Sequence, residues 1–475
     1  MAKIKYFINK ECETEFVIQI HDKKTQLTRY IVDIPGLISF LECNGFRKYP
    51  ISTKEYIPIR LEYGHIIVPV SEYYMKDVVM YYLEENGKTE EKNQFHYRDY
   101  FNKNLVTSLE TFNFNLHTGN KDSCYIYYKN GVLKITKNDF EILSYEELDG
   151  FIWKEQIINR DIKLPIASHL ENFNFNKFLR NISGQADNRY FSLVSIIGYL
   201  LHNFKDKSLA KAIIFTDEDI DVNGISANGG KGKSILASAL SKMTNVCKKE
   251  GKNIETGNRF FLQDIELHNN ILYFDDVKQD FDFESLYSAI TGSITSEKKF
   301  KTPITIPFEY SPKILISSNY TVIGKEGYTD ERRRIDFEFS SYYNRYRNPN
   351  NEFNETFFDD WDDEAWFKFD SLMIYCIQFY LNYGLIEPPK IRFHENKVIQ
   401  NTHPTFFEFM ESKLLRHKSY NKKELFNEYV SEYKDDISNI TIIAFKKWLD
   451  YYLLYYKKWK FTHYKSNSNA MIKIL

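Results

Sequence analysis

The sequence predicts an α/β protein with a central parallel sheet, flanked by an α+β region at the N-terminus and a helical module with a terminal hairpin at the C-terminus. Two observations predict the central part. Apolar, strand-like runs alternate with helical stretches from about residue 208 to 345, as in a parallel sheet whose strands are joined by helices. A glycine-rich stretch, SANGGKGKSIL (residues 226–236), follows the first of these runs. The chain of 475 residues has room for about three domains.

The composition limits the classes of protein to consider. Apolar residues make up 43% of the chain and the formal net charge is −2, so a nucleic-acid partner would have to be held by local basic patches. The five cysteines lie far apart without a CxxC pair, which argues against a disulfide framework or a zinc knuckle. No apolar run approaches the roughly 20 residues that cross a bilayer, and the N-terminus lacks the apolar core of a signal peptide. We therefore expect a cytoplasmic protein without membrane contact.

The first 205 residues carry mixed signals. Short alternating apolar runs predict strands in residues 1–105, with one helix over residues 77–85. In residues 106–205, CYIYYKNGVLKIT (124–136) predicts a hairpin, because Asn130 and Gly131 suit a two-residue turn with positive φ. A helix is predicted over residues 189–204, with an apolar face formed by Phe191, Val194, Ile197 and Leu201.

Residues 206–345 carry three strand candidates, AIIF (212–215), ILYF (271–274) and KILIS (313–317). The glycine-rich stretch lies between the first two, and a helix is predicted after it over residues 235–246. Glycines let successive backbone N–H groups converge on an anion, a lysine reaches the phosphates, and a serine binds Mg²⁺. The alternative is a plain flexible loop. The predicted phosphate-binding residues are Asn228, Gly229, Gly230, Lys231, Gly232, Lys233, Ser234 and Ile235.

Polar residues end the two later strand candidates. Asp275 and Asp276 follow ILYF, and Asn319 follows KILIS. The carboxyl ends of parallel strands face a nucleotide bound at the edge of the sheet. One carboxylate there can hold Mg²⁺ through water while its neighbour polarises the attacking water, and an amide can reach the γ-phosphate. We therefore predict a Mg²⁺ site at Ser234 and Asp275. A solvated acidic turn and an asparagine that merely ends a strand are the alternatives.

Two basic clusters lie around the third strand candidate. The segment ITGSITSEKKFKTPITIPFEY (290–310) predicts a hairpin whose lysines neutralise nucleic-acid phosphates while an aromatic ring stacks on bases. Its candidate DNA-binding residues are Lys298, Lys299, Phe300 and Lys301. The segment DERRRIDFEF (330–339) contains three arginines, of which Arg333 and Arg334 are candidates for stabilising the charge of a phosphoryl-transfer transition state. A solvated hairpin and a surface salt-bridge patch are the alternatives.

The C-terminal third reads as mostly helical. Residues 346–390 predict a long helix that ends at Gly384 and a linker that begins at Pro388. In residues 391–475, helices over 421–433 and 441–456 and a hairpin over 460–475 have the order of a winged-helix module. An apolar face in the second helix leaves Lys446 and Lys447 pointing outward, and they are candidates for DNA contact because basic and aromatic residues interleave here. Ordinary surface lysines are the alternative.

The order of these motifs resembles that in the superfamily 3 helicases, AAA+-type P-loop ATPases of viruses, phages and mobile elements. The resemblance covers residues 190–345, and NGVLKI, FIWKEQII and IIGYLLH resemble the region that precedes the ATPase in phage and poxvirus-type primase-helicases. It implies ATP and Mg²⁺ as cofactors and unwinding of duplex DNA by a hexameric ring in the cytoplasm of a bacterial host, with a separate primase or polymerase as a further partner. The catalytic residues that it implies are Lys233, Asp275, Asp276, Asn319, Arg333 and Arg334.

Two features depart from the family pattern. Ala227 stands where the phosphate loop begins with glycine, and an acidic insert, DEDIDVNGIS (217–226), delays the glycines. Asp217, Asp219 and Asp221 form a rival metal cluster, although we expect a solvated loop. Residues 1–105 contain no D-x-D on a strand, so we expect no primase activity. The alternative functions are an ATP-switched origin-binding or scaffold protein, a small-molecule kinase and, less favoured, a bifunctional primase-helicase.

Overall fold

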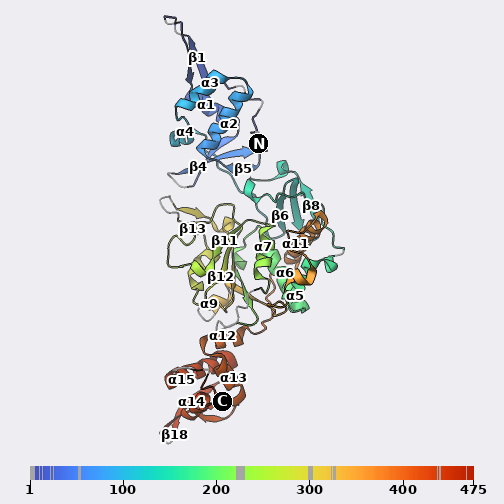
Figure 1. Ribbon diagram of the computed structural model, residues 1–475, viewed down its shortest axis with the longest axis vertical. Coiled ribbons are helices and arrows are strands. Elements are labelled where there is room, and N and C mark those ends of the chain that lie inside the picture. The colour runs from blue at the N-terminus through green and yellow to red at the C-terminus, as the bar shows by residue number, and fades with distance from the viewer. Residues whose placement is uncertain are drawn as a thin grey trace.

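In the computed structural model the chain forms three parts along one long axis, with the N-terminal part at one end and the C-terminal part at the other (Figure 1). The structure describes residues 6–9, 11–12, 14–21, 23–24, 26–51, 55–168, 170–220, 230–297, 303–322, 324, 328–435, 437, 440–466 and 468–475. Within these ranges, none of the helices combines the length and the apolar character that a membrane span requires.

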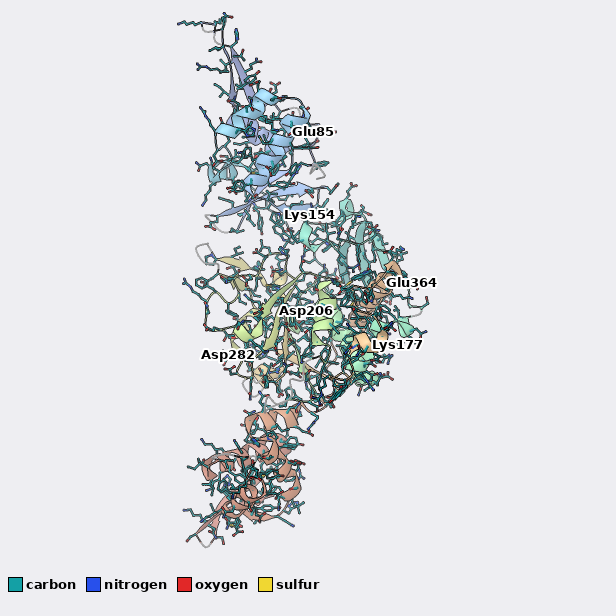
Figure 2. All side chains as sticks on the ribbon, in the orientation of Figure 1. Glu85, Lys154, Lys177, Asp206, Asp282 and Glu364 are labelled. Atoms are coloured by element: carbon teal, nitrogen blue, oxygen red, sulfur yellow. The ribbon has the colours of Figure 1, made fainter. Side chains whose placement is uncertain are left out.

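The N-terminal part is a mixture of strands and helices, as predicted. Its main sheet has the order β3-β4-β5-β9, and β9 (Ile152–Trp153) joins it in parallel from beyond residue 105. Lys154, labelled in Figure 2, follows β9 and pairs with Glu62 on β4 at 2.8 Å. The other elements are β1 (Val17–His21), β2 (Thr28–Val32), α1 (Ile34–Cys43), β3 (Phe46–Pro50), β4 (Tyr56–Glu62), β5 (Ile66–Pro69), α2 (Glu72–Glu85), α3 (Thr89–Tyr97) and α4 (Lys103–Ser108).

The region before the central sheet contains the predicted hairpin and a buried helix. β6 (Ser123–Tyr128) and β7 (Gly131–Thr136) pair antiparallel, and β8 (Phe140–Leu143) extends them. The two-residue turn is Lys129–Asn130 and not the predicted Asn130–Gly131, because Gly131 already pairs with Tyr128 as the first residue of β7. α6 (Asp187–Leu201) differs from the one-faced helix we expected, because it is buried on nearly all sides while Phe191 is 37% exposed. α11 (Asp363–Tyr383) packs along it so closely that a Cβ at Gly198 would lie 2.1 Å from the Cys376 carbonyl oxygen.

The central sheet has five parallel strands in the order β11-β12-β15-β10-β16. Three are the predicted ones, β10 (Ala212–Asp217), β12 (Ile271–Val277) and β15 (Lys313–Ser318). β11 (Val246–Glu250) and β16 (Arg334–Phe339) were not predicted, and α7 (Lys233–Ser241) ends before Val246, where we expected it to continue. Neither strand is an uninterrupted apolar run. β11 (VCKKE) is an edge strand that exposes charged residues, whereas β16 (RIDFEF) buries every residue, including two carboxylates.

Each face of this sheet has its own apolar core. α5 (Asn174–Ile182), α6, α7 and α11 form one core with one face, so residues 106–205 and 346–390 share it with the sheet. On the other face lie α8 (Tyr287–Thr291) and the antiparallel pair β13 (Ile294–Ser296) and β14 (Ile304–Ile306). Short helices α9 (Tyr328–Glu331) and α10 (Pro349–Phe353) flank β16 in the chain. Both faces are therefore covered, as a parallel sheet requires.

The C-terminal part contains the two helices and the hairpin that the sequence predicts. α14 (Lys422–Glu432) and α15 (Ile442–Tyr451) are followed by β18 (Phe461–Ser466) and β19 (Asn469–Ile474). β17 (Ser419–Asn421) completes a sheet of order β17-β19-β18. α12 (Phe393–Asn401) and α13 (Pro404–Lys413) precede these elements, and α12 lies between the central and C-terminal parts (Figure 1).

Candidate functional site

The strand order of the central sheet reverses at β10. From β10 the chain passes to β11 at the far edge, returns through β12 and β15 to one side of β10, and then continues to β16 on its other side. In open α/β sheets, ligands bind outside the carboxyl ends of the strands at such a reversal. The residues that follow β10, β12 and β15 are therefore the ones to compare.

Two glycines lead into α7 in a conformation that favours glycine. Gly230 and Gly232 have φ of 95° and 101°, and a Cβ added to Gly232 would lie 2.7 Å from the ring of Phe178. The glycine is thus needed for backbone conformation and for space. Ser234 is exposed in the first turn of α7, and Ile235 packs against the core. The predicted residues Asn228 and Gly229 lie outside the described residues, as do Ala227 and Asp221.

Lys233, the first residue of α7, reaches the ends of two strands. Its Nζ lies 2.6 Å from a carboxylate oxygen of Asp217 at the end of β10 and donates to Oδ1 of Asn319 at 2.9 Å. Asn319 follows β15 and donates its side-chain amide to Asp276 at 2.9 Å. The structure therefore brings the predicted residues Lys233, Asn319 and Asp276 into one hydrogen-bonded group at the reversal point.

Asp217 is the member of this group that sequence reasoning misplaced. We expected a solvated loop from residue 217 onward, but Asp217 is the last residue of β10 and only 1% exposed. Burial raises the pKa of Asp217 and lowers the pKa of Lys233, in each case against the opposite charge of its partner. The signal was present in the sequence, since Asp217 comes two residues after the predicted strand AIIF (212–215), as Asn319 comes two residues after KILIS (313–317).

The rival metal cluster is not formed by the described residues. Asp217 pairs with Lys233, whereas Asp219 pairs with Lys231 at 3.5 Å and with Arg392 at 2.9 Å. Within the described ranges no group of three or more histidine, cysteine, aspartate or glutamate residues could hold a metal ion. Each of these carboxylates is committed to a cation of the protein instead.

Asp275 and Asp276 have different environments although they are neighbours. Asp275 Oδ1 accepts hydrogen bonds from Tyr273 at 2.6 Å and Ser317 at 2.9 Å, while its Oδ2 lies 2.7 Å from Lys248. Burial would raise the pKa of Asp275, but these partners outweigh it and the pKa is lowered. Asp275 is thus held between β12, β15 and β11.

Asp276 instead faces the Lys233 group. Its φ is 57°, a left-handed conformation that is uncommon for aspartate, and the pairing of β12 with β15 shifts register between Phe274 and Val277. Such a bulge turns a side chain away from the direction that regular alternation would give it. The Asp276 carboxylate contacts Asn319 and also pairs with Lys252 at 2.6 Å. These contacts favour Asp276 over Asp275 as the carboxylate that meets a ligand, and sequence alone could not separate the two.

The arginine cluster divides into buried and accessible members. Arg334 is 6% exposed and its guanidinium pairs with Asp336 and, at 3.3 Å, with Asp330. The surface salt-bridge patch considered above is therefore an interior ion-pair network at the start of β16, and Arg334 cannot reach a neighbouring molecule. Arg333 is half-buried over the ring of Tyr287, and Arg332 is exposed. Of the two arginines predicted to be catalytic, Arg333 alone keeps access to solvent.

The predicted DNA-binding residues are described only in part. β13 and β14 form the expected antiparallel hairpin, but its tip, with Lys298, Lys299, Phe300 and Lys301, lies outside the described residues. In α15 the apolar face packs inward through Phe445, Leu449 and the following Tyr452, which are fully buried. Lys447 is exposed and Lys446 half-exposed on the same helix. Their contact with DNA remains a prediction.

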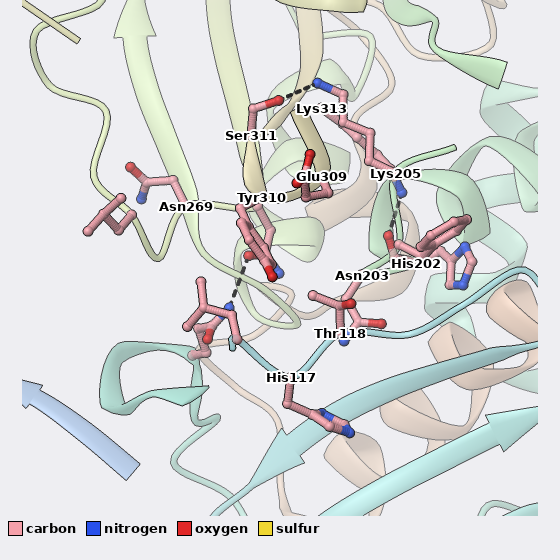
Figure 3. Close-up of a pocket in the computed structure, with 15 residues that line it drawn as sticks. His117, Thr118, His202, Asn203, Lys205, Asn269, Glu309, Tyr310, Ser311 and Lys313 are labelled. Carbon is pink, nitrogen blue, oxygen red and sulfur yellow. Dashed lines mark hydrogen bonds between the residues drawn. The ribbon is translucent and has the colours of Figure 1, made fainter. Parts of the chain in front are cut away.

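A second group of buried lysines lies at the opposite, amino edge of the same sheet (Figure 3). Lys205 donates to Ser311 at 2.7 Å, and Lys313, the first residue of β15, donates to the carbonyl oxygens of Tyr199 at 2.5 Å and His202. They line a small cavity of about 50 Å³. Burial lowers the pKa of each lysine to about 7. Because carbonyl oxygens at the end of α6 already accept from Lys313, this group serves to join α6 to the sheet.

The chain has been compared with known proteins. No protein-family model matches it, and no curated protein sequence matches it. Among solved structures, the A form apo structure of the NrS-1 C terminal region (CTR) aligns with 12% sequence identity and a TM-score of 0.43, covering 92% of this chain and 99% of that chain. The A form apo structure of the same region, residues 305–718, aligns with 13% identity and a TM-score of 0.41, covering 92% and 98%. A likeness at these values carries no inference about function.

Proposed function

We propose that the protein is an ATP-dependent DNA helicase of the superfamily 3 type, acting as an oligomeric ring during replication of a phage, plasmid or mobile element. The observation that carries the proposal is the group at the carboxyl edge of the sheet. A lysine that begins a helix behind two positive-φ glycines meets an amide and a carboxylate from two other strands. This is the set of groups that phosphoryl transfer requires.

The residues present fit ATP and Mg²⁺. In this proposal the backbone N–H groups at the start of α7, a helix of nine residues, hold the phosphates together with Lys233, because a helix N-terminus favours anions. The exposed hydroxyl of Ser234 and the carboxylate of Asp276 supply the oxygen ligands that Mg²⁺ prefers. Bound Mg²⁺ would neutralise charge on the phosphates. Asn319 fixes the positions of Asp276 and Lys233 relative to each other by hydrogen bonds to both, and Asp275 links the ends of the strands.

The exchange of partners at Lys233 is the central step of the proposed cycle. In the structure Lys233 pairs with the buried Asp217. A phosphate group would compete with Asp217 for the ammonium group, and the carboxylate that it leaves behind would be buried without its partner. Since an unpaired buried carboxylate is costly, we expect Asp217 to take up a proton or to move when nucleotide binds. After product release, the buried carboxylate of Asp217 would again pair with Lys233.

DNA would be held by the β13–β14 hairpin and the C-terminal module. The hairpin lies between α8 and β15, directly before the strand that ends in Asn319. The order helix, strand, helix, helix and hairpin from α13 to β19 supports the proposal of a winged-helix module. Lys446 and Lys447 lie on the third of these helices, α15. Replacing Lys298, Lys299 and Lys301 should weaken the salt dependence of DNA binding and abolish unwinding, while ATP hydrolysis without DNA persists.

Strand displacement on forked DNA tests the proposal directly. The full chain should separate the strands only with ATP and Mg²⁺ and should hydrolyse ATP faster when DNA is added. Light scattering with nucleotide should give the mass of an oligomer. The matched control is Lys177→Ala, since Lys177 is an exposed lysine on α5, and it should behave as the unmodified protein. DNA-stimulated hydrolysis without strand separation would favour the ATP-switched origin-binding protein, and hydrolysis indifferent to DNA would exclude a DNA motor.

A further inference from the structure

The first helix of the C-terminal part lies against the strand ends that form the candidate site. Asn396 on α12 donates to the carbonyl oxygen of Glu218, directly after β10, at 2.7 Å. Gln400 exchanges two hydrogen bonds with the backbone of Thr321, two residues beyond Asn319, at 2.9 and 3.0 Å. Gln279, which follows β12, donates to the Gln400 carbonyl oxygen at 3.4 Å. α12 is thus attached to all three segments that follow Asp217, Asp276 and Asn319.

A network of ion pairs and hydrogen bonds connects the start of α12 to the glycine-rich loop. Arg392, the residue before α12, pairs with one oxygen of Asp219 at 2.9 Å. The other oxygen of Asp219 lies 3.5 Å from Lys231 and accepts a hydrogen bond from Ser341, whose hydroxyl also accepts from Lys231 at 2.8 Å. The carboxylate of Glu338 accepts from the backbone N–H groups of residues 391 and 392 at 2.7 and 2.9 Å, so the backbone before α12 is held in place.

The buried ammonium group of Lys231 is held in place by this network. Lys231 is 5% exposed and lies two residues before Lys233, within the loop that leads into α7. Among the described residues, Asp219 is the carboxylate that pairs with Lys231, and a buried ammonium group that loses its carboxylate is strongly disfavoured. The burial of Asp219 would raise its pKa, but Ser341, Lys231 and Arg392 together lower it, so Asp219 is ionised near neutral pH. Lys231 is therefore an anchor for the loop rather than a phosphate ligand through its side chain.

We propose that Asp219 and Arg392 are positioning residues for the nucleotide site, which hold the glycine-rich loop through Lys231 and so make nucleotide affinity depend on how the C-terminal module is seated. This inference rests on the proposed function. It predicts reciprocity, because coupling between two binding sites is thermodynamically symmetric. DNA that shifts the module changes nucleotide affinity, and nucleotide changes DNA affinity by the same factor.

The first test measures this factor in the full chain. Binding of a fluorescent ATP analogue is titrated with and without forked DNA, for the unmodified protein and for Arg392→Gln, Asp219→Asn and the double variant. The Arg392–Asp219 pair is partly exposed, so Arg392→Gln should reduce the ratio of the two affinities by roughly three- to fivefold. Asp219→Asn also removes the carboxylate partner of the buried Lys231 and should reduce the ratio by at least as much. If the residues act in series, the double variant should lose no more than the larger single effect.

The matched control is Glu395→Gln. Glu395 pairs with Arg392 at 2.9 Å, as Asp219 does, but belongs to α12 and has no contact with the loop in the described residues. It should leave the ratio unchanged. Equal ratios in the unmodified protein and Arg392→Gln, or an equal loss in Glu395→Gln, would overturn the inference while the ATP site stands.

Hydrogen exchange without nucleotide tests the positioning of the loop separately from the coupling between nucleotide and DNA. Arg392→Gln should speed amide exchange at residues 230–236 by about threefold, matching the affinity effect, and Glu395→Gln should not. If the unmodified protein binds no ATP analogue, the proposed function fails together with the coupling, and exchange alone decides whether Arg392 positions the loop. Unchanged exchange in Arg392→Gln would overturn that part as well.

Discussion

The two edges of the central sheet both bury lysines, but they satisfy them differently. At the carboxyl edge Lys233 is held by Asp217 and Asn319. At the amino edge Lys205 and Lys313 are held by carbonyl and hydroxyl oxygens, without a carboxylate partner among the described residues. A lysine held by a side-chain carboxylate can exchange that carboxylate for another anion, such as a phosphate. The backbone carbonyl oxygens that hold Lys313 are fixed in position at the end of α6. The first edge is built for exchange of partners and the second for attachment of α6, and four changes test this contrast.

The largest effect is expected at the carboxyl edge for Lys233→Ala. Loss of the ammonium group should lower ATP turnover by on the order of 10²–10³, as for removal of a preorganised group that meets developing charge. Strand separation should be lost with it. Steady-state hydrolysis and displacement assays measure both, with Lys177→Ala as the control on an exposed lysine. ATP hydrolysis retained by Lys233→Ala would contradict the assignment of the site.

The second change compares the two neighbouring carboxylates. Asp276→Asn should lower turnover by roughly a hundredfold with little change in folding, because Asp276 is the carboxylate beside Asn319. Asp275→Asn should instead lower the free energy of unfolding by about 1–3 kcal/mol, since it disturbs hydrogen bonds with Tyr273 and Ser317. Turnover and chemical denaturation are measured for both variants. The reverse pattern would assign the reacting carboxylate to Asp275.

The third change concerns the entry to α7. Gly232→Ala combines a positive φ with a contact of 2.7 Å to the Phe178 ring, and it should destabilise the fold by about 1–3 kcal/mol. Gly257→Ala is the control, because a Cβ there meets nothing within 4 Å. Denaturant titration compares the two. Equal stability of both variants would mean that the loop tolerates a side chain at residue 232.

The fourth change, at the amino edge, is expected to alter stability only as a function of pH. The folded-state pKa of Lys313 is lowered to about 7, below its unfolded value of about 10.4. Between these values the unfolded chain binds the additional proton, so this lysine makes stability rise with pH, by at most about 1.4 kcal/mol per pH unit. Lys313→Met should flatten the rise between pH 7 and 9.5, measured by denaturation, whereas Lys177→Met should not. An unchanged slope in Lys313→Met would mean that Lys313 stays charged when buried.

Much of the central part could be predicted from local pattern. Three of its five strands follow from apolar periodicity. Outside the central sheet, the β6–β7 hairpin, with its turn one residue earlier than predicted, and the C-terminal helices and hairpin follow from periodicity and turn residues. β11 and β16 could not be predicted in this way. β11 is an edge strand with exposed charged residues, whereas β16 is fully buried although three of its residues are charged. In β16, Arg334 and Asp336 neutralise each other and Glu338 accepts backbone N–H groups from residues 391 and 392. Residues 391 and 392 are distant from Glu338 in the sequence, and the pair of Arg334 and Asp336 is buried only in the folded chain.

For the candidate site, residue types and their order along the chain were enough to select Lys233, Asn319 and the pair Asp275 and Asp276, since parallel strands place their carboxyl ends on one edge. Tertiary contacts were needed for the rest. They pair Asp217 with Lys233, turn Asp276 rather than Asp275 toward the site through a bulge, withdraw Arg334 into the interior, and attach α12 to the strand ends. The physical reason is range: periodicity and turn preference act over a few residues, whereas burial and ion pairing join residues that only folding brings together.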